Sequence, residues 1–126
     1  MKIECISNID PQTNEMIDNN WISLHKVYLV LSLEVTSKGE IRFIIMTNNG
    51  RTPGVLSSVL FRTTCPKIPS NWVCKYEDSY LVMGPEKWMD DSLWEYSFWE
   101  SYHSLTCPEA EKVFKEELEK MIAEVG

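Results

Sequence analysis

The 126-residue sequence has no long apolar run, and it opens without one. Its longest run, Val27 to Leu31, is far shorter than the about 20 residues that a membrane helix needs. The first ten residues contain no stretch like the roughly 7–15 apolar residues of a secretory signal. We therefore expect a soluble protein that stays in the cytoplasm and has no membrane partner.

Closely spaced metal or redox ligands are also missing. The cysteines are Cys5, Cys65, Cys74 and Cys107, and none forms the Cys-x-x-Cys pair of zinc sites and redox dithiols. In a chain without an export signal we expect reduced thiols, some of them buried as small apolar groups. The sequence therefore predicts neither a metal site nor a cofactor.

Catalytic signatures are scarce, because only two histidines, His25 and His103, are present. Glu100-x-x-His103 is half of a two-metal carboxylate motif, which requires that motif twice and two further glutamates. No Gly-x-Ser-x-Gly, phosphate-binding glycine loop or His-Glu-x-x-His occurs, and no local signature supports a Cys–His pair. Since most catalytic mechanisms need a base, we expect a protein that is not an enzyme.

Charge is plentiful but unevenly placed. The chain has 19 acidic and 12 basic residues, for a net charge of −7. The sequence through Pro85 contains eight acidic and eight basic residues. From Glu86 onward it contains eleven acidic and four basic residues. The whole excess lies in the last third, and such asymmetry concerns partners rather than fold. It argues against nucleic acid, which needs a basic surface to replace its counterions.

Short alternating patterns through residue 85 predict strands. The clearest alternation lies on one face of a strand at Val27, Leu29, Leu31, Leu33 and Val35. A three-residue loop, Ser37 to Gly39, with Gly39 left-handed, pairs Glu34 with Arg42 in the next strand. The register also places Leu33 opposite Phe43 on the apolar side. Five or six such strands predict a small, strongly bent antiparallel sheet or a partly open barrel.

Residues 86–126 change to a helical period and are acidic. Thr106-x-x-Glu109 is a capping box that predicts the start of the last helix. One apolar stripe of that helix comprises Ala110, Val113, Phe114, Leu118, Met121, Ile122 and Val125. We expect an α+β protein with one domain, residues 1–126, in which the C-terminal helices pack on the sheet.

The segment from Trp88 to Tyr102 is the candidate functional site. It holds three of the five tryptophans, two tyrosines, a phenylalanine and four acids, with no base. If helical, it has two apolar stripes, more than one sheet contact needs, so it is either core or a binding face. In a binding face, aromatic anchors supply affinity and carboxylates steer a basic partner. The candidate partner-binding residues are Trp88, Asp90, Asp91, Trp94, Glu95, Trp99, Glu100 and Tyr102.

Four short motifs occur in order between Trp21 and Glu100. They are Asn49-Gly50-x-Thr52-Pro53, Ile68-Pro69-Ser70-Asn71-Trp72, Pro85-x-x-Trp88 and Phe98-Trp99-Glu100. As a set they resemble bacterial immunity proteins of contact-dependent growth inhibition and related polymorphic toxin systems. The resemblance implies a cytoplasmic protein that neutralises one toxin domain, often a nuclease with a basic active-site surface. It implies no particular contact residues.

The sequence thus predicts an inhibitor, monomeric when free, that occludes the active site of a cognate basic toxin domain. One alternative is a homo-oligomeric scaffold subunit whose aromatic segment pairs with its own copy, although the acids of the two copies would repel. Another is a small-ligand-binding barrel or enzyme that uses His25, His103 or a thiol.

Overall fold

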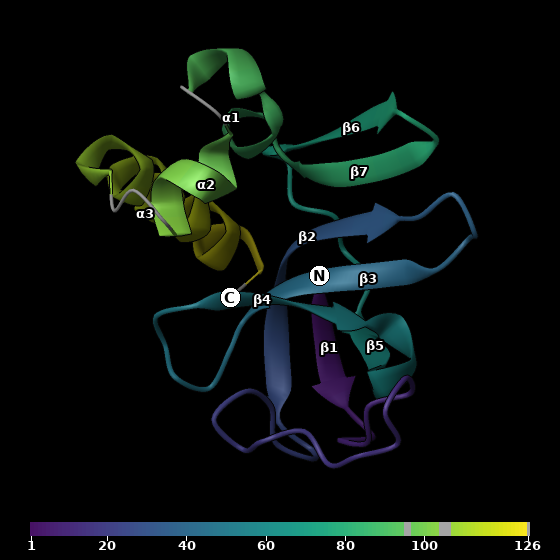
Figure 1. Ribbon diagram of the computed structural model, residues 1–126. Coiled ribbons are helices and arrows are strands. Elements are labelled where there is room, and N and C mark those ends of the chain that lie inside the picture. Colours follow the sequence, from purple (N-terminus) through teal and green to yellow (C-terminus); the bar gives the residue numbers. More distant parts are fainter. Residues whose placement is uncertain (95–96, 104–106, 126) are drawn as a thin grey trace. The chain divides into compact units, whose positions relative to one another are not determined.

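The computed structural model describes residues 1–94, 97–103 and 107–125, apart from the side chains of Asp91 and Val125. Its strands are β1 (Lys2–Cys5), β2 (Val27–Val35), β3 (Ile41–Met46), β4 (Pro53–Ser57), β5 (Phe61–Cys65), β6 (Trp72–Glu77) and β7 (Tyr80–Pro85). Its helices are α1 (Glu86–Met89), α2 (Phe98–His103) and α3 (Pro108–Val125), with 3-10 turns η1 (Ser58–Leu60) and η2 (Asp91–Leu93) (Figure 1). The predicted α+β class is confirmed.

The sheet is antiparallel and does not close. Its order is β4-β3-β2-β1-β5, and β7 pairs with both β2 and β6. Seven strands form where five or six were predicted, because the apolar stretch from Val55 to Thr63 is interrupted by the η1 turn. The β6–β7 loop is Asp78-Ser79, and the φ angles of both residues are positive, as primed hairpin turns require.

The chain divides into two compact units. Unit 1 comprises residues 1–67 and 75–82, and unit 2 comprises residues 68–74 and 83–126. Unit 2 therefore takes in the motif Ile68-Pro69-Ser70-Asn71-Trp72 together with all the helices. The prediction that residues 1–126 form one domain, with the helices packed on the sheet, stays a prediction.

The first hairpin of unit 1 has the predicted register. Glu34 lies opposite Arg42, and Leu33 lies opposite Phe43. Gly39 has a φ of +81°, the left-handed conformation that the three-residue loop requires. Glu34 and Arg42 form an ion pair at 3.6 Å, whereas Leu33 and Phe43 are both buried. The opposite faces of this hairpin therefore carry charge and core, as expected.

Strand β2 does not keep one alternation along its whole length. In the first half of β2 the even-numbered Tyr28 and Val30 are buried, and Val27 is 49% exposed. The prediction places the odd-numbered residues on the buried face. The register with β3 shifts by one residue at Leu31, which makes Leu31 a β-bulge. Beyond the bulge Leu33 is buried, as predicted. The extra residue at the bulge moves the odd-numbered side chains to the buried face in the second half of β2. The predicted buried face is therefore wrong only before the bulge.

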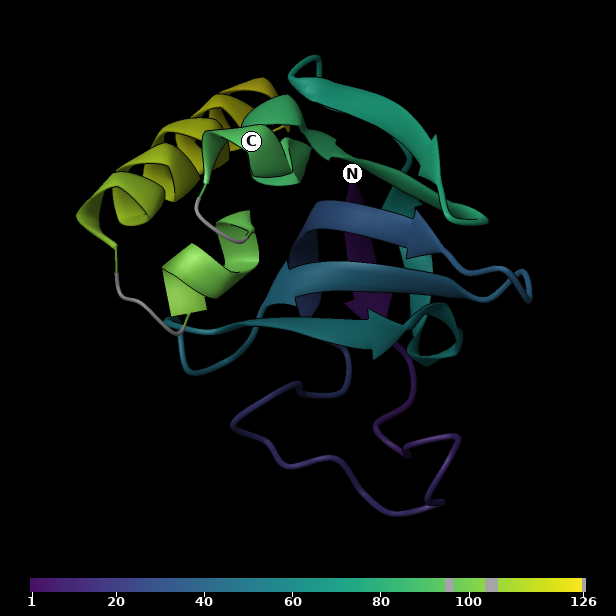
Figure 2. The same cartoon turned by 45° about the horizontal axis from the view of Figure 1, so that its top comes forward.

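The side chain of Asn48 makes four hydrogen bonds that anchor the long loop between β1 and β2. The loop extends from the ends of these strands in Figure 2. Asn48 donates to the Asn19 carbonyl at 2.7 Å and to the Ser23 hydroxyl at 2.8 Å. Its amide oxygen accepts from Lys26 Nζ at 2.9 Å and from the buried Tyr28 hydroxyl at 2.8 Å. Asn48 thus joins the turn after β3 to both the loop and β2.

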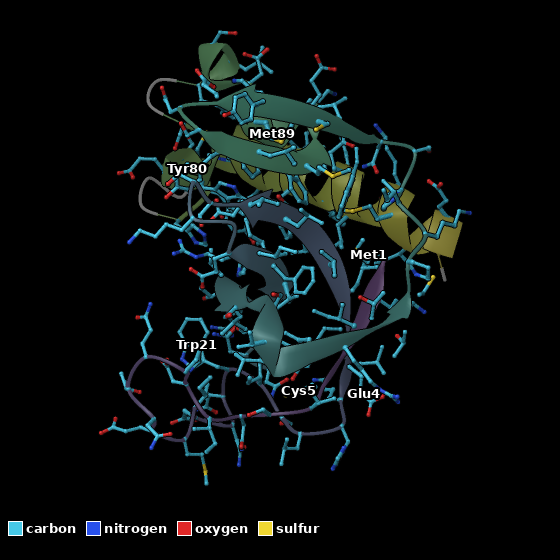
Figure 3. The ribbon with its side chains drawn as sticks, turned by 90° about the vertical axis from the view of Figure 1, so that its right-hand side faces the viewer. Met1, Glu4, Cys5, Trp21, Tyr80 and Met89 are labelled. Atoms are coloured by element: carbon cyan, nitrogen blue, oxygen red, sulfur yellow. The ribbon has the colours of Figure 1, made fainter. Side chains whose placement is uncertain are left out.

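A close contact at Gly54 fixes the same loop against β4. A Cβ atom at this position would lie 2.8 Å from Cζ3 of Trp21 and 2.9 Å from Cγ2 of Thr47. Trp21, labelled in Figure 3, therefore lies directly on the backbone of β4. Only a residue without a side chain allows that approach.

Replacing Asn48 tests the loop's anchor. We expect Asn48→Ala to lower the free energy of unfolding by about 2 kcal/mol, because it removes four hydrogen bonds and leaves the buried Tyr28 hydroxyl without its acceptor. Urea denaturation followed by circular dichroism measures the change. Asn20→Ala, on the same loop, is the control, and an equal effect of the two variants would contradict the assignment.

A second prediction concerns Glu4 and Arg62, which lie opposite each other on β1 and β5. Arg62 donates to Glu4 at 2.7 Å, and this hydrogen bond lowers the pKa of Glu4 from its ordinary 4.5. A lowered carboxyl pKa stabilises the fold above the unfolded pKa, and the contribution is lost as the pH falls through the folded value.

We therefore expect Arg62→Gln to destabilise the protein at pH 7 and to match the wild type once the pH falls well below 4.5. Lys38→Gln, which removes the same charge from an exposed loop, is the control. Denaturation curves between neutral and acidic pH measure the difference, and a gap that does not narrow in acid would count against the pairing.

Candidate partner-binding surface

Trp88 lies in the core of unit 2. It comes from the four-residue helix α1 and is 3% exposed. Its ring stacks against Phe98 at 5.6 Å and against Phe114 at 5.1 Å, with interplanar angles of 11° and 12°. Trp88 was expected to be a partner-contacting residue, but its burial leaves no ring face for a partner. Pro85-x-x-Trp88 therefore serves the core.

Four rings form the outer layer of the same cluster, and we call Trp94, Trp99, Tyr102 and His103 the aromatic surface. The first three are half-buried and His103 is exposed. Along α2, Phe98 stacks with Tyr102 and Trp99 stacks with His103, the i,i+4 pairs that a helix brings together. The predicted stripes do not divide into core and surface. Trp94, Phe98 and Tyr102 were expected on one stripe, but only Phe98 is fully buried. On the other stripe Leu93 is 58% exposed, and Tyr96 lies outside the described residues.

Contacts from the core hold these rings in place. Trp99 meets the edges of Trp88 and Phe98 at 5.5 and 5.0 Å, and Tyr102 packs on Phe114 at 4.6 Å. The indole N–H of Trp94 donates to the Lys87 carbonyl at 3.1 Å. Because their orientations are already set, a partner would order few side chains on contact.

Two of the four predicted carboxylates, Asp90 and Glu100, lie within the described residues. Glu100 is exposed on α2, and Asp90 is partly buried at the end of α1, where its side chain accepts from the Ser92 amide at 3.1 Å. Glu95 and the side chain of Asp91, both predicted contacts, lie outside the described residues. Of the eight predicted residues, Trp99, Glu100 and Tyr102 share α2, and Trp94 contacts Phe98 of that helix at 5.3 Å.

Two side chains of the surface have altered proton affinities. Burial, and then the charge of Glu111, raises the pKa of Tyr102, so this phenol stays protonated. Desolvation of the His103 imidazole, which packs against Trp99 and Tyr102, lowers its pKa, so this ring is neutral at pH 7. Both rings are therefore uncharged at neutral pH.

The net charge coincides with the unit that carries the rings. Unit 1 has eight acids and eight bases, whereas unit 2 has eleven acids and four bases. The entire −7 therefore belongs to unit 2. A charge of this size on a small unit raises the encounter rate with a basic partner and repels an acidic one.

The motif Ile68-Pro69-Ser70-Asn71-Trp72 fixes a segment of unit 2 against α3. Ser70 donates from its hydroxyl to Glu124 at 2.8 Å, and Asn71 donates to Glu117 at 2.8 Å. The Trp72 indole N–H meets Met121 Sδ at 3.2 Å. Positions 117, 121 and 124 share one face of a helix, so the motif has a structural role.

Helix α3 buries four members of its predicted stripe, Ala110, Val113, Phe114 and Met121. Leu118 is half-buried, and the side chain of Val125 lies outside the described residues. Ile122, a predicted member, is 49% exposed, whereas Glu117 is 4% exposed. Glu117 is accommodated because Asn71 and Lys120 donate to its carboxylate. The predicted cap, Thr106, lies outside the described residues.

The turn motif Asn49-Gly50-x-Thr52-Pro53 is likewise structural. The Asn49 side chain accepts from the amides of Arg51 and Thr52 at 2.8 and 2.9 Å. Gly50 has a φ of +71°. These contacts account for the turn without any ligand.

Within residues 1–94, 97–103 and 107–125, no three histidine, cysteine or acidic side chains are grouped as metal ligands. In the same ranges, no helix combines the length and the apolar character needed to cross a membrane. The four cysteines are free thiols, with Cys5 buried and Cys74 exposed.

Comparison with known proteins yields no relative: no family model matches the sequence, and neither the curated proteins nor the solved structures contain a match.

The division into core and surface can be measured by mutation. We expect Trp88→Ala to lower the free energy of unfolding by about 3–5 kcal/mol, because it leaves a cavity among stacked rings. Trp94→Ala, from the half-buried layer, is the matched control and should cost about 1 kcal/mol. Urea denaturation followed by far-UV circular dichroism measures both, and equal losses would contradict the division.

Proposed function

We propose that this protein is an immunity protein that binds a cognate basic toxin domain in the cytoplasm and blocks its active site. The observation that carries the proposal is the coincidence of half-buried aromatic rings with the unit that holds the whole net charge of −7. The sequence motifs that resemble immunity proteins agree with it. A toxin that acts on nucleic acid has a basic substrate site, and carboxylates take the place of the phosphates there.

The rings and the carboxylates have separate tasks in this proposal. Trp94, Trp99 and Tyr102 are the anchors, since large aromatic side chains dominate binding energy at protein interfaces. Glu100 and the other acids of unit 2 accelerate encounter and orient the partner. Nanomolar binding needs about −12 kcal/mol, which a few well-buried anchors supply.

The same charge argues against self-association through this surface. Two copies that meet at a two-fold interface would bring the acids of unit 2 toward their own symmetry mates. Like charges at an interface oppose binding. We therefore propose a monomer in the absence of the toxin.

The direct test is protection. A gene for an exported protein beside this one would supply the toxin candidate, and its C-terminal domain is expressed with and without this chain. We expect growth arrest without the chain and normal growth with it, and a 1:1 complex of the purified proteins. A toxin domain that stays fully active and unbound in the presence of the chain would refute this pairing.

Electrostatic steering gives a sharper test on the purified complex. We expect the association rate to fall steeply as salt rises, while the dissociation rate changes little. Glu100→Gln should slow association and Trp94→Ala should speed dissociation. Glu15→Gln, which removes the same charge from unit 1, is the control.

Stopped-flow or surface-based kinetics at several salt concentrations measure both rates. An association rate that does not depend on salt, or an equal effect of Glu15→Gln and Glu100→Gln, would contradict steering by unit 2.

A further inference from the structure

Unit 1 contains a cavity of about 380 Å³ that the aromatic surface does not share. One wall is the loop between β1 and β2, with Asp10, Pro11 and Ile17, and the other comes from β3 and β4, with Arg42 and Val55. The volume falls in the range of small-ligand sites, about 300–1,000 Å³. The loop that forms the first wall is anchored further along the chain, at Asn19 and Ser23, by the Asn48 hydrogen bonds described above.

The charges around the cavity are unequal. Arg42 lies 3.2 Å from Glu40 on its own hairpin and 3.6 Å from Glu34 on β2. The guanidinium is therefore already shared between two carboxylates. Asp10, on the loop, is partly buried and pairs with no cation among the residues that the structure describes. The backbone amide of Gln12 donates to its Oδ1 at 2.8 Å and orients the carboxylate.

Apolar groups complete the lining. Ile17 from the loop and Val55 from β4 lie beside the charged residues, and the side chain of Val55 is 55% exposed. Leu60, at the end of η1, is almost fully buried and closes the cavity beneath them. A ligand there would meet an apolar wall along part of its length and a carboxylate without a counter-ion at another point.

We propose that this cavity binds a guanidinium or ammonium group on an apolar stem, with Asp10 pairing with the cation and Ile17 and Val55 covering the stem. An anion would face the carboxylates of Asp10 and Glu40, and it would have to displace Glu40 from Arg42. Lysine and arginine side chains have the proposed chemistry, and so do free alkyl amines. The proposal shares no residue with the aromatic surface and does not depend on the immunity function.

The test uses the full chain and three probes. These are Nα-acetyl-arginine amide, its neutral isostere Nα-acetyl-citrulline amide, and agmatine, a free guanidino amine. Each is titrated while NMR follows the methyl groups of Ile17, Val55 and Leu60. We expect saturable shifts with the two cationic probes and at least about tenfold weaker binding of the citrulline amide, since it lacks the charge-assisted hydrogen bond.

Variants separate this site from general attraction to acids. Asp10→Asn should weaken the cationic probes at least about tenfold, because it removes the unpaired charge. Asparagine also forms the turn to residue 12, so the loop keeps its conformation. Glu15→Gln, on the same loop but outside the cavity lining, should bind as the wild type does.

The probes also identify the source of the cation. Comparable binding of the arginine amide and agmatine supports a side chain on a protein, whereas binding of agmatine alone supports a free amine. Equal binding of the arginine and citrulline amides, or unmoved methyl signals up to the solubility limit of every probe, would overturn the proposal. So would an Asp10→Asn variant with wild-type affinity.

Discussion

The contact of Trp88 with Phe98 and Phe114 determines the structure of unit 2. Helices α1 and α2 have four and six residues, far below the about 12–15 that an isolated helix needs in water. Their stability has to come from tertiary contacts, and aromatic packing is the densest set that they make. Pairs of rings at these separations contribute about 0.5–1.5 kcal/mol each beyond their burial.

The same packing explains why other rings stay outside. Once Trp88 and Phe98 fill the interior, their neighbours Trp99 and Tyr102 contact them only by edge or by one face. Each outer ring therefore has a fixed orientation and an open side. Burial of one tryptophan and partial exposure of the next are consequences of a single arrangement.

The sequence predicts structure best where a local rule is decisive. The register of the β2–β3 hairpin follows from Gly39 and from the requirement that Glu34 and Arg42 face water, and it is confirmed. The bulge at Leu31 has no local signal, since an apolar residue fits either alternation. Likewise, Glu117 reads as a solvent-facing position, because its partner Asn71 is 46 residues away in the chain.

The candidate site was predictable as a segment but not residue by residue. Composition marks Trp88 to Tyr102 as aromatic and acidic, and charge counting assigns the −7 to the later part of the chain. The burial of one indole rather than another depends on where two very short helices begin and end. A hydrophobic period cannot be recognised over so few residues, so the sequence does not locate these ends. The cavity of unit 1 left no signal at all, because Asp10 and Arg42 meet only through the fold.

The contact between Trp21 and Gly54 has an evolutionary consequence. Since a side chain at position 54 would occupy the space of the indole, neither position can change freely while the other is kept. Descendants of this chain that gain a side chain at position 54 should carry a smaller residue at position 21. Paired substitutions at these two sites would therefore reveal this loop geometry in an alignment before any coordinates existed.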